Sequence, residues 1–347
     1  MRAAIFEKPG LENLKVIDDI EQPKISDHDI LIKVKLVGIN PIDHFVASGT
    51  VPKINPLPHI PGAESSGIIE QVGSHVNTTS NNNNRNFKKG DRVIVHNKVF
   101  DGTCDMCLSG LDMICRNGGL IGAITNGGFA EYIAVPERNV FKVPDDMDWE
   151  LAASLPVTSL TPYHALKEAS LKINEYLLVF GASGNTGMIA VQLAKKMGAR
   201  VIAVSKDNWV KDDYGADYII SDYDRVTEKV KEITNGKMAD VVLNSLGINT
   251  WTSSFESVGI NGRWVAFGGL TGAEVKLNVQ ALYSRQIKLI GSTGGTRKDL
   301  QELIDIASAK QLKVRVWKKF KLDNVKEALE ALFTKERDGR IFLEVAA

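Results

Sequence analysis

All three cysteines of the 347-residue chain lie in one short stretch, "FDGTCDMCLSGLDMIC", at residues 100–115. Their spacing is Cys104-x2-Cys107-x7-Cys115. Thiolates at such short intervals allow a loop to wrap around a tetrahedral zinc ion, which in structural sites has four protein ligands. The stretch therefore predicts a metal-binding loop. The alternative is a loop with three free thiols and no metal.

A second group of residues suited to chemistry follows a predicted strand. The stretch "VFGASGNTGMIAVQLA" places Gly181, Gly184 and Gly187 between an apolar strand and an amphipathic helix. Glycines there permit a tight turn and a close approach of the backbone to a pyrophosphate, which the N-terminus of the helix attracts. A glycine-rich turn without a ligand is the alternative. We expect the turn to bind a nicotinamide dinucleotide through these glycines and through Ser183, Asn185 and Thr186.

The next predicted strand bears on which dinucleotide binds. "RVIAVS" leads into Ser205 and Lys206, whereas a site for NAD usually carries an acid there that bonds the ribose hydroxyls. A hydroxyl and a cation suit a 2′-phosphate better. We therefore expect NADPH, with NADH possible because Asp207 could serve as the ribose acid. Asn244, which ends "DVVLN", is expected to face the ligand at the carboxyl end of its strand.

The elements that position these residues fall into two groups. Residues 1–150 contain short β-branched runs broken by Gly, Pro and Asn, such as "ILIKVKLVGIN" and "DRVIVHN", which is typical of an irregular antiparallel β domain. In residues 151–295, six apolar runs mostly alternate with helical stretches, which predicts a doubly wound parallel sheet. The tail, residues 296–347, has the pattern of strand, helix and strand. The expected class is α/β with two domains.

Composition excludes several classes of partner. Lys plus Arg equals Asp plus Glu, 42 each, so charge favours neither nucleic acid nor an anionic membrane. No apolar run reaches the roughly 18 residues of a spanning helix, and the N-terminus lacks the apolar core of a signal peptide. Thiolates for zinc persist best in a reducing compartment, so the cytoplasm is expected. The Asn-rich stretch at residues 77–86 is interpreted as a loop insertion.

Four motifs together resemble the medium-chain dehydrogenase/reductase superfamily: "PGAESSGIIEQVG" (61–73), "FKKGDRVIV" (87–95), "GGFAEYIAVP" (127–136) and "GASGNTG". The resemblance covers nearly the whole chain. It implies a GroES-like catalytic domain, residues 1–150 completed by 296–347, and a Rossmann domain at residues 151–295. It also implies a homodimer or homotetramer in which "IKLIGSTGG" (287–295) pairs across a two-fold axis.

The resemblance also bears on metals. Zinc alcohol dehydrogenases of this superfamily carry a structural zinc on four cysteines, and the last three match Cys104, Cys107 and Cys115. Asp101 stands at the position of the first, and a carboxylate is a legitimate zinc ligand. One structural zinc ion per chain is therefore expected.

The ligands of the catalytic zinc have no match. Asn40, Ala63 and Val157 occupy those positions, and an amide, a methyl and an isopropyl group cannot hold the metal. We therefore expect no catalytic zinc. Ile42 and Phe45 likewise stand where relay enzymes carry a hydroxyl and a histidine. The alternative is a zinc ion held by other nearby side chains, drawn from Asp43, His44, His59 and Glu64.

Further roles follow from the resemblance alone. Thr161 matches a threonine that touches the nicotinamide, and Gly268 and Gly269 match backbone that meets its carboxamide side. Arg340 matches a basic residue that reaches the pyrophosphate, with a solvated tail charge as the alternative. Asn40 would donate its amide to the substrate oxygen, or would only form a turn before Pro41.

These residues predict a reaction. "GINPIDHFVASG" is similar to the segment in the zinc-free quinone oxidoreductase branch of the superfamily. Without a Lewis acid, an electron-poor acceptor suits hydride transfer better than an unactivated alcohol. We expect an NADPH-dependent reductase of a small-molecule quinone or α,β-unsaturated carbonyl. The alternatives are an alcohol dehydrogenase with unusual zinc ligands and a non-catalytic NADPH-binding protein.

Overall fold

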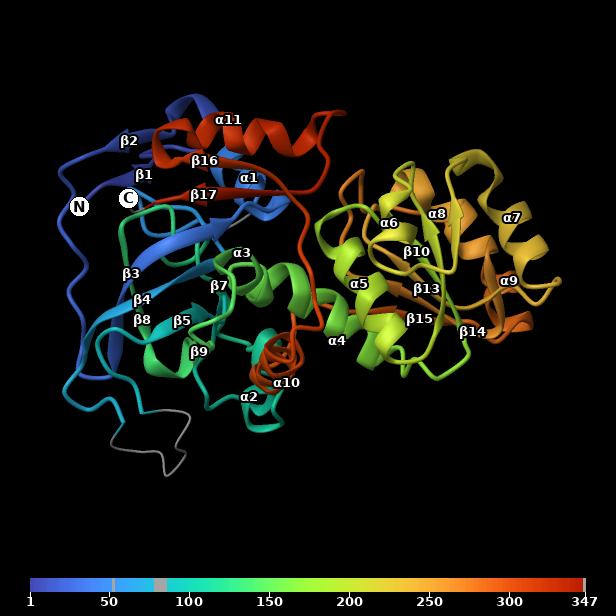
Figure 1. Ribbon diagram of the computed structural model, residues 1–347, viewed down its shortest axis with the longest axis horizontal. Helices are drawn as coiled ribbons and strands as arrows, with labels where there is room; N and C mark the ends of the chain where they lie inside the picture. Colours follow the sequence, from blue (N-terminus) through green and yellow to red (C-terminus); the bar gives the residue numbers. More distant parts are fainter. Residues whose placement is uncertain (52–53, 78–85, 346–347) are drawn as a thin grey trace. The chain divides into compact units, whose positions relative to one another are not determined.

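The computed structural model describes residues 1–51, 54–77 and 86–345. The chain divides into two compact units: unit 1 comprises Met1–Val157 and Thr296–Ala347, and unit 2 comprises Thr158–Gly295 (Figure 1). The boundary predicted after residue 150 lies slightly before the observed one, which follows Val157. Most of the Asn-rich stretch interpreted as a loop insertion lies outside the described residues.

Unit 1 is built on a seven-stranded sheet in the order β16-β17-β3-β4-β5-β9, with β8 paired to β3 outside this path. The central strand, β3 (Asp29–Gly38), pairs antiparallel with β4, β8 and β17, whereas β16 and β17 pair in parallel. The remaining strands of this sheet are β4 (Ser65–Val72), β5 (Arg92–Val95), β8 (Tyr132–Pro136), β9 (Val140–Lys142), β16 (Val316–Lys321) and β17 (Arg340–Glu344). Two smaller pairs are β1 (Ala3–Ile5) with β2 (Lys15–Ile17) and β6 (Lys98–Val99) with β7 (Gly119–Leu120).

The sequence of β3, "DILIKVKLVG", explains its central place. Ile30, Ile32 and Val34 are fully buried in the main core of unit 1, and a strand rich in β-branched residues packs well when neighbours cover it. The tail strand β17 adds Ile341 and Leu343 to the same core. The predicted β-rich domain is confirmed, and the tail adds β17 to its sheet beside β3.

The helices of unit 1 lie mainly in the connections, and apart from α10 they are short. α1 follows Asn40, has Pro41 at its first position and ends at Gly49, whose φ is +81°; proline at the start and left-handed glycine after the end are the usual helix stops. The α-helices are α1 (Pro41–Ser48), α2 (Asp105–Leu108), α3 (Trp149–Ala152), α10 (Arg297–Ser308) and α11 (Val325–Glu330). The 3-10 turns are η1 (Leu11–Asn13), η3 (Asp112–Ile114), η4 (Glu137–Asn139), η7 (Leu322–Asn324) and η8 (Ala331–Phe333).

Unit 2 contains a six-stranded sheet in the order β12-β11-β10-β13-β14-β15, and every neighbouring pair is parallel. Numbered within the unit, this is the strand order 3-2-1-4-5-6 of the Rossmann fold. The predicted doubly wound parallel sheet is therefore confirmed. Its strands are β10 (Tyr176–Phe180), β11 (Arg200–Val204), β12 (Tyr218–Ile220), β13 (Ala239–Asn244), β14 (Val258–Ala266) and β15 (Lys288–Gly291).

Parallel strands need crossover connections, which here are mostly helices. The crossover helices are α5 (Asn185–Lys196), α6 (Trp209–Asp212), α7 (Val226–Ile233), α8 (Ile248–Glu256) and α9 (Val279–Ser284), with the 3-10 turn η6 (Tyr223–Arg225), and α4 (Leu160–Glu168) precedes the first strand. A π-helical turn, η5 (Leu155–Ser159), precedes α4. In the described residues, no helix combines the length and apolar character that a bilayer crossing requires.

Candidate functional site

The glycine turn between β10 and α5 has a geometry that side chains would obstruct. Gly181 has a φ of +66°, which favours glycine. A Cβ on Gly187 would lie 2.1 Å from the carbonyl oxygen of Gly181, so only glycine lets the helix start this close to the strand. α5 begins at Asn185 after the N-cap Gly184, and its first turn consists of uncharged residues. Such a turn suits a phosphate group.

The two residues after β11 differ in what they can offer a ligand. Ser205 is buried, and its hydroxyl accepts a hydrogen bond from the Asp207 backbone N–H at 3.0 Å and donates one to the Asp207 carboxylate at 3.4 Å. Lys206 is exposed. Lys206 is therefore the accessible cation at this position, and a role for Ser205 would require its hydroxyl to leave Asp207.

Asn244, at the end of β13, organises the turn that follows it. Its amide nitrogen donates to the hydroxyls of Thr250 and Ser254, both at 2.9 Å, and its oxygen accepts from the backbone N–H of Leu246 at 2.8 Å. The side chain is 1% exposed. A ligand would contact this amide only by displacing one of its partners, so the ligand-facing role stays a prediction.

Gly268 and Gly269 follow β14 and are exposed. A Cβ on Gly268 would lie 2.9 Å from the carbonyl oxygen of Ser245, so the loop after β14 packs on the loop after β13. Because the sheet is parallel, these loops and the glycine turn share its carboxyl edge. The structure thus gathers at one edge the predicted cofactor residues that follow β10, β11, β13 and β14.

Tyr223, in η6, is a neighbour of this edge that sequence reasoning missed. Its hydroxyl donates to the carbonyl oxygen of Val204 at 3.2 Å. Burial raises the pKa of Tyr223, the charge of Asp207 adds to the rise, and the backbone N–H of Gly181 opposes it. Tyr223 therefore links the end of β11 to the glycine turn. Its place in the loop "SDYDRV" carried no motif that could have revealed this.

Thr161 lies on α4, away from those loops in the sequence. It is 9% exposed, and α4 packs against α5. The π-helical turn directly before α4 is a further feature that the sequence did not reveal, and such turns are frequent at functional sites. The contact of Thr161 with a nicotinamide stays a prediction.

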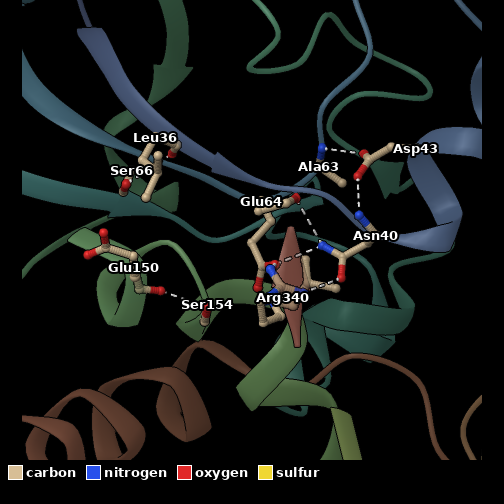
Figure 2. A network of polar contacts seen from close by, with 11 residues as sticks. Leu36, Asn40, Asp43, Ala63, Glu64, Ser66, Glu150, Ser154 and Arg340 are labelled. Carbon is tan, nitrogen blue, oxygen red and sulfur yellow. Dashed lines mark hydrogen bonds and ion pairs between the residues drawn. The ribbon is translucent and has the colours of Figure 1, made fainter. Parts of the chain in front are cut away.

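In unit 1, the predicted residues Asn40 and Arg340 meet Glu64 in a buried polar network (Figure 2). Arg340 Nη2 donates to Glu64 Oε2 at 2.6 Å, and both side chains are fully buried. Arg340 Nη1 donates to Asn40 Oδ1 at 2.9 Å, and Asn40 Nδ2 donates to Glu64 Oε2 at 2.7 Å. The backbone N–H of Val157 donates to the other Glu64 oxygen at 2.8 Å. These hydrogen bonds offset part of the cost of burying an ion pair.

This geometry constrains two predicted roles. Besides Glu64, Asn40 Nδ2 also donates to the carbonyl oxygen of Gly38 at 3.2 Å, so donation to a substrate would require giving up one bond, most readily the longer one. Arg340 is held by Glu64 and Asn40 inside unit 1. Neither the substrate contact nor the pyrophosphate contact is tested by these bonds, and both stay predictions.

Asp43, in the first turn of α1, lies beside the network. Its two carboxylate oxygens accept hydrogen bonds from the backbone N–H groups of Asn40 and Ala63, each at 2.8 Å. Burial raises the pKa of Asp43 to about 7; those N–H groups oppose the rise, and the negative charge of Glu64 adds to it. Asp43 thus braces the start of α1 and changes charge near neutral pH.

Asp101, Cys104, Cys107 and Cys115 are the one group of potential metal-ligating side chains, among the described residues, whose ligand atoms lie close together, all within 4.8 Å of one another. Three soft sulfurs and a carboxylate oxygen fit a closed tetrahedral zinc site. Asp43, His44, His59 and Glu64 form no such group in the described part of the chain. The buried His59, for example, has its ring nitrogens 2.9 Å and 3.2 Å from backbone carbonyl oxygens.

The surroundings favour the anionic forms of Asp101 and Cys104, whereas burial raises the pKa of the Cys107 thiol. Asp101 accepts hydrogen bonds from the Asn117 amide at 2.6 Å and from the backbone N–H groups of Thr103 and Cys104, which hold the pKa of its carboxyl well below its usual range. Backbone N–H groups of Cys107 and Arg116 lower the pKa of the Cys104 thiol. Anionic ligands at this position suit a divalent cation.

Comparison with known proteins decides the family. The alcohol dehydrogenase GroES-like domain matches residues 26–145, and the zinc-binding dehydrogenase domain matches residues 186–309. An alcohol dehydrogenase from Geobacillus stearothermophilus is 32% identical and covers 99% of this chain and 100% of its own. The chain belongs to the medium-chain dehydrogenase/reductase superfamily.

Relatives within the superfamily have different activities, among them alcohol oxidation and quinone reduction. A thermostable alcohol dehydrogenase from Pyrobaculum aerophilum is 38% identical with a TM-score of 0.90, covering 99% of both chains, and a structure of such an enzyme from that organism contains cobalt and zinc. Human quinone oxidoreductase is 27% identical and covers 95% of this chain and 93% of its own. This medium-chain dehydrogenase/reductase is therefore an NAD(P)-dependent oxidoreductase that acts on a small molecule.

The geometry of this dehydrogenase/reductase fits a nicotinamide dinucleotide at the carboxyl edge of unit 2. When bound there, the cofactor supplies or accepts a hydride. The glycine turn would hold its pyrophosphate, since Gly181 and Gly187 clear the approach and α5 directs backbone N–H groups toward it. Lys206 would face the adenosine end, because it follows the strand next to β10.

Proposed function

We propose that the protein reduces a quinone or an α,β-unsaturated carbonyl with NADPH, without a zinc ion at the reacting carbon. The observation that carries this proposal is the Asn40–Glu64–Arg340 network. The superfamily's catalytic zinc ligands correspond to Asn40, Ala63 and Val157, and here Asn40 is engaged with Glu64 and Arg340. Val157 contributes only its backbone N–H, to Glu64.

The chemistry suits such an acceptor. NADPH gives up a hydride and becomes NADP+, and the acceptor gains the hydride and one proton from solvent. Conjugation in a quinone or enone spreads the negative charge left by the hydride, so hydrogen-bond donors suffice to stabilise the oxyanion. Asn40 is the candidate donor, through the amide hydrogen now given to Gly38, and Thr161 would position the nicotinamide ring.

Alcohol oxidation is the second candidate, because the alcohol dehydrogenase relatives share the higher identity. The deciding experiment follows NADPH oxidation with a quinone and with a conjugated enone, and in parallel NADP+ reduction with primary and secondary alcohols. Turnover of the conjugated acceptors alone supports the proposal. Chelator-sensitive alcohol oxidation with a second zinc ion per chain would replace it, and tight NADPH binding with no turnover of either class would leave a non-catalytic binding protein.

For the cofactor, we infer a preference for NADPH from the exposed Lys206 beside the more buried Ser205. A cation at this place attracts a 2′-phosphate. Changing Lys206→Ile together with Ser205→Asp should shift the ratio of dissociation constants toward NADH by at least about tenfold. An unchanged ratio would remove the argument.

We further infer one structural zinc ion per chain, held by Asp101, Cys104, Cys107 and Cys115. The closeness of these four side chains supports it. Metal analysis of protein purified without chelator should give a zinc-to-chain ratio near one. Thiolate-bound zinc also fits the cytoplasm as the proposed location.

For the assembly, we infer a homodimer or homotetramer that forms through the edge strand β15. This strand ends the order of the unit 2 sheet, and Leu289 on it is 40% exposed. An unpaired edge can pair with a second copy across a two-fold axis. Sedimentation of wild type and of Leu289→Lys should show a monomer only for the variant.

A further inference from the structure

The base of the metal loop contains an excess of positive charge. Phe100, directly before Asp101, lies between two guanidinium groups: the Cζ atoms of Arg138 and Arg297 are each 4.8 Å from its ring centre. Lys98, two residues earlier, is only 8% exposed. With Asp112 of η3, these residues form what we call the base cluster: Lys98, Phe100, Asp112, Arg138 and Arg297.

Asp112 forms an ion pair with Arg297, the first residue of α10. Arg297 Nε donates to Asp112 Oδ2 at 2.6 Å, and the Asp112 side chain is 5% exposed. Lys98 is attracted by the same carboxylate, although burial lowers the pKa of its ammonium to about 8. Lys98 therefore still carries its charge at neutral pH. The cluster contains three cations, Lys98, Arg138 and Arg297, and one carboxylate, so its net charge is about plus two.

The loaded metal site would carry the opposite charge. Three thiolates and the Asp101 carboxylate bring four negative charges, and a zinc ion cancels two of them, so about two remain. Arg138 connects the two groups directly, because its Nη1 donates to the backbone oxygen of Asp101 at 3.2 Å. Groups that hold the residues of a metal site in place commonly affect its metal affinity.

We propose that the base cluster balances the charge of the metal site and that Arg297 couples zinc occupancy to α10. This inference rests on the proposed structural zinc and is independent of the proposed reaction. Arg297 is the first residue of α10, where Thr296 and Asp299 form a capping box. α10 is also the first helix after the chain returns to unit 1. Asp112 lies in the loop between Cys107 and Cys115, so release of the metal would loosen this segment and weaken the contact of Asp112 with Arg297 at the start of α10.

Zinc affinity tests the coupling. Arg297→Leu is expected to weaken zinc binding, measured by competition with a chromophoric chelator, by about 10- to 100-fold. Arg297→Lys should recover part of that loss because it restores the charge. The matched control is Lys298→Leu. Lys298 is the next residue of α10, its side chain is 83% exposed, and its distance of 3.9 Å to Glu302 makes a weak ion pair. Zinc affinity of Arg297→Leu equal to that of the control would overturn the proposal.

Hydrogen exchange tests the reverse direction. Removing zinc from the intact protein should speed amide exchange in residues 297–304 and leave α5 unchanged. Asp112→Asn should show the faster exchange even with zinc added, which keeps a readout if Arg297→Leu folds poorly. Unchanged exchange in residues 297–304, or a wild type that takes up no zinc, would overturn the inference. A protein that binds zinc here but reduces no acceptor would instead remove only the proposed reaction.

Discussion

Two regions of unit 1 hold carboxylates in opposite situations. At the metal loop, the Asp101 carboxylate accepts hydrogen bonds from neutral groups, namely the Asn117 amide and the backbone N–H groups of Thr103 and Cys104. In the buried network, Glu64 already has the guanidinium of Arg340 at 2.6 Å. The first region holds the ligands of the proposed zinc ion, and the second contains its own cation.

Because the two carboxylates have different surroundings, removing one charged side chain should have a different effect in each region. The Glu64–Arg340 pair is fully buried, so its energy depends on both members being present. The metal loop is only half-buried, so water can partly solvate its polar side chains. We therefore expect changes in the buried network to affect folding most, and changes at the loop to affect metal binding most.

The largest expected effect comes from Arg340→Met. The change leaves Glu64 buried without its cation, which typically costs about 3–5 kcal/mol of unfolding free energy. Denaturant unfolding measures the loss, and adding Glu64→Gln to the same chain should recover much of it. Arg225→Met breaks an exposed pair with Glu228 and should cost less than about 1 kcal/mol. Equal losses in the two variants would mean that the network is not the stabilising element.

Gly38→Ala should come next. A Cβ at Gly38 would lie 2.1 Å from Arg340 Nη2 and 2.5 Å from Glu64 Oε2, so the ion pair must shift, at a cost of about 1–3 kcal/mol. Gly291→Ala is the matched control, because a Cβ there meets no atom within 4 Å in the described structure. Thermal unfolding of both variants checks the prediction. It fails if Gly38→Ala has the same melting temperature as the wild type.

At the metal loop, Asp101→Asn should weaken zinc binding with little change in metal-free stability. An amide is a poorer zinc ligand than a carboxylate, and we expect a loss of about 10- to 100-fold in affinity. Asp105→Asn is the control, since Asp105 pairs with Arg116 on the exposed side. Competition with a chelator gives both affinities. If Asp101→Asn binds zinc as the wild type does, a different fourth ligand is present.

The last prediction is a pH dependence at Asp43, spread over several pH units. Its folded pKa, raised by burial to about 7, exceeds the usual unfolded value of about 3.9. The folded state therefore binds more protons between these values, and this stabilising contribution is lost as the pH rises toward 7. The slope is at most about 1.4 kcal/mol per pH unit. Unfolding curves of Asp43→Asn between pH 4 and 7 should lack this slope, whereas those of the exposed Asp212→Asn should keep it.

Sequence alone determined the features that are local along the chain. The six strands of unit 2, the glycine turn at Gly181–Gly187 and the metal loop each reside in a short stretch whose spacing reflects a backbone requirement or a ligand set. A parallel sheet follows from alternating strands and helices because each parallel pair needs a crossover. These features could be predicted without knowing what any residue touches.

Only the tertiary structure decided which distant side chains meet. Asn40 and Arg340 are 300 residues apart in sequence, and Asp112 and Arg297 are 185 apart. No periodicity marks such pairs, because they form when separate elements pack and buried charges must find partners. The same holds for Tyr223 against Val204, and for the burial of Ser205 beside the exposed Lys206. Folding therefore decided which of the predicted residues are already engaged and which stay available to a ligand.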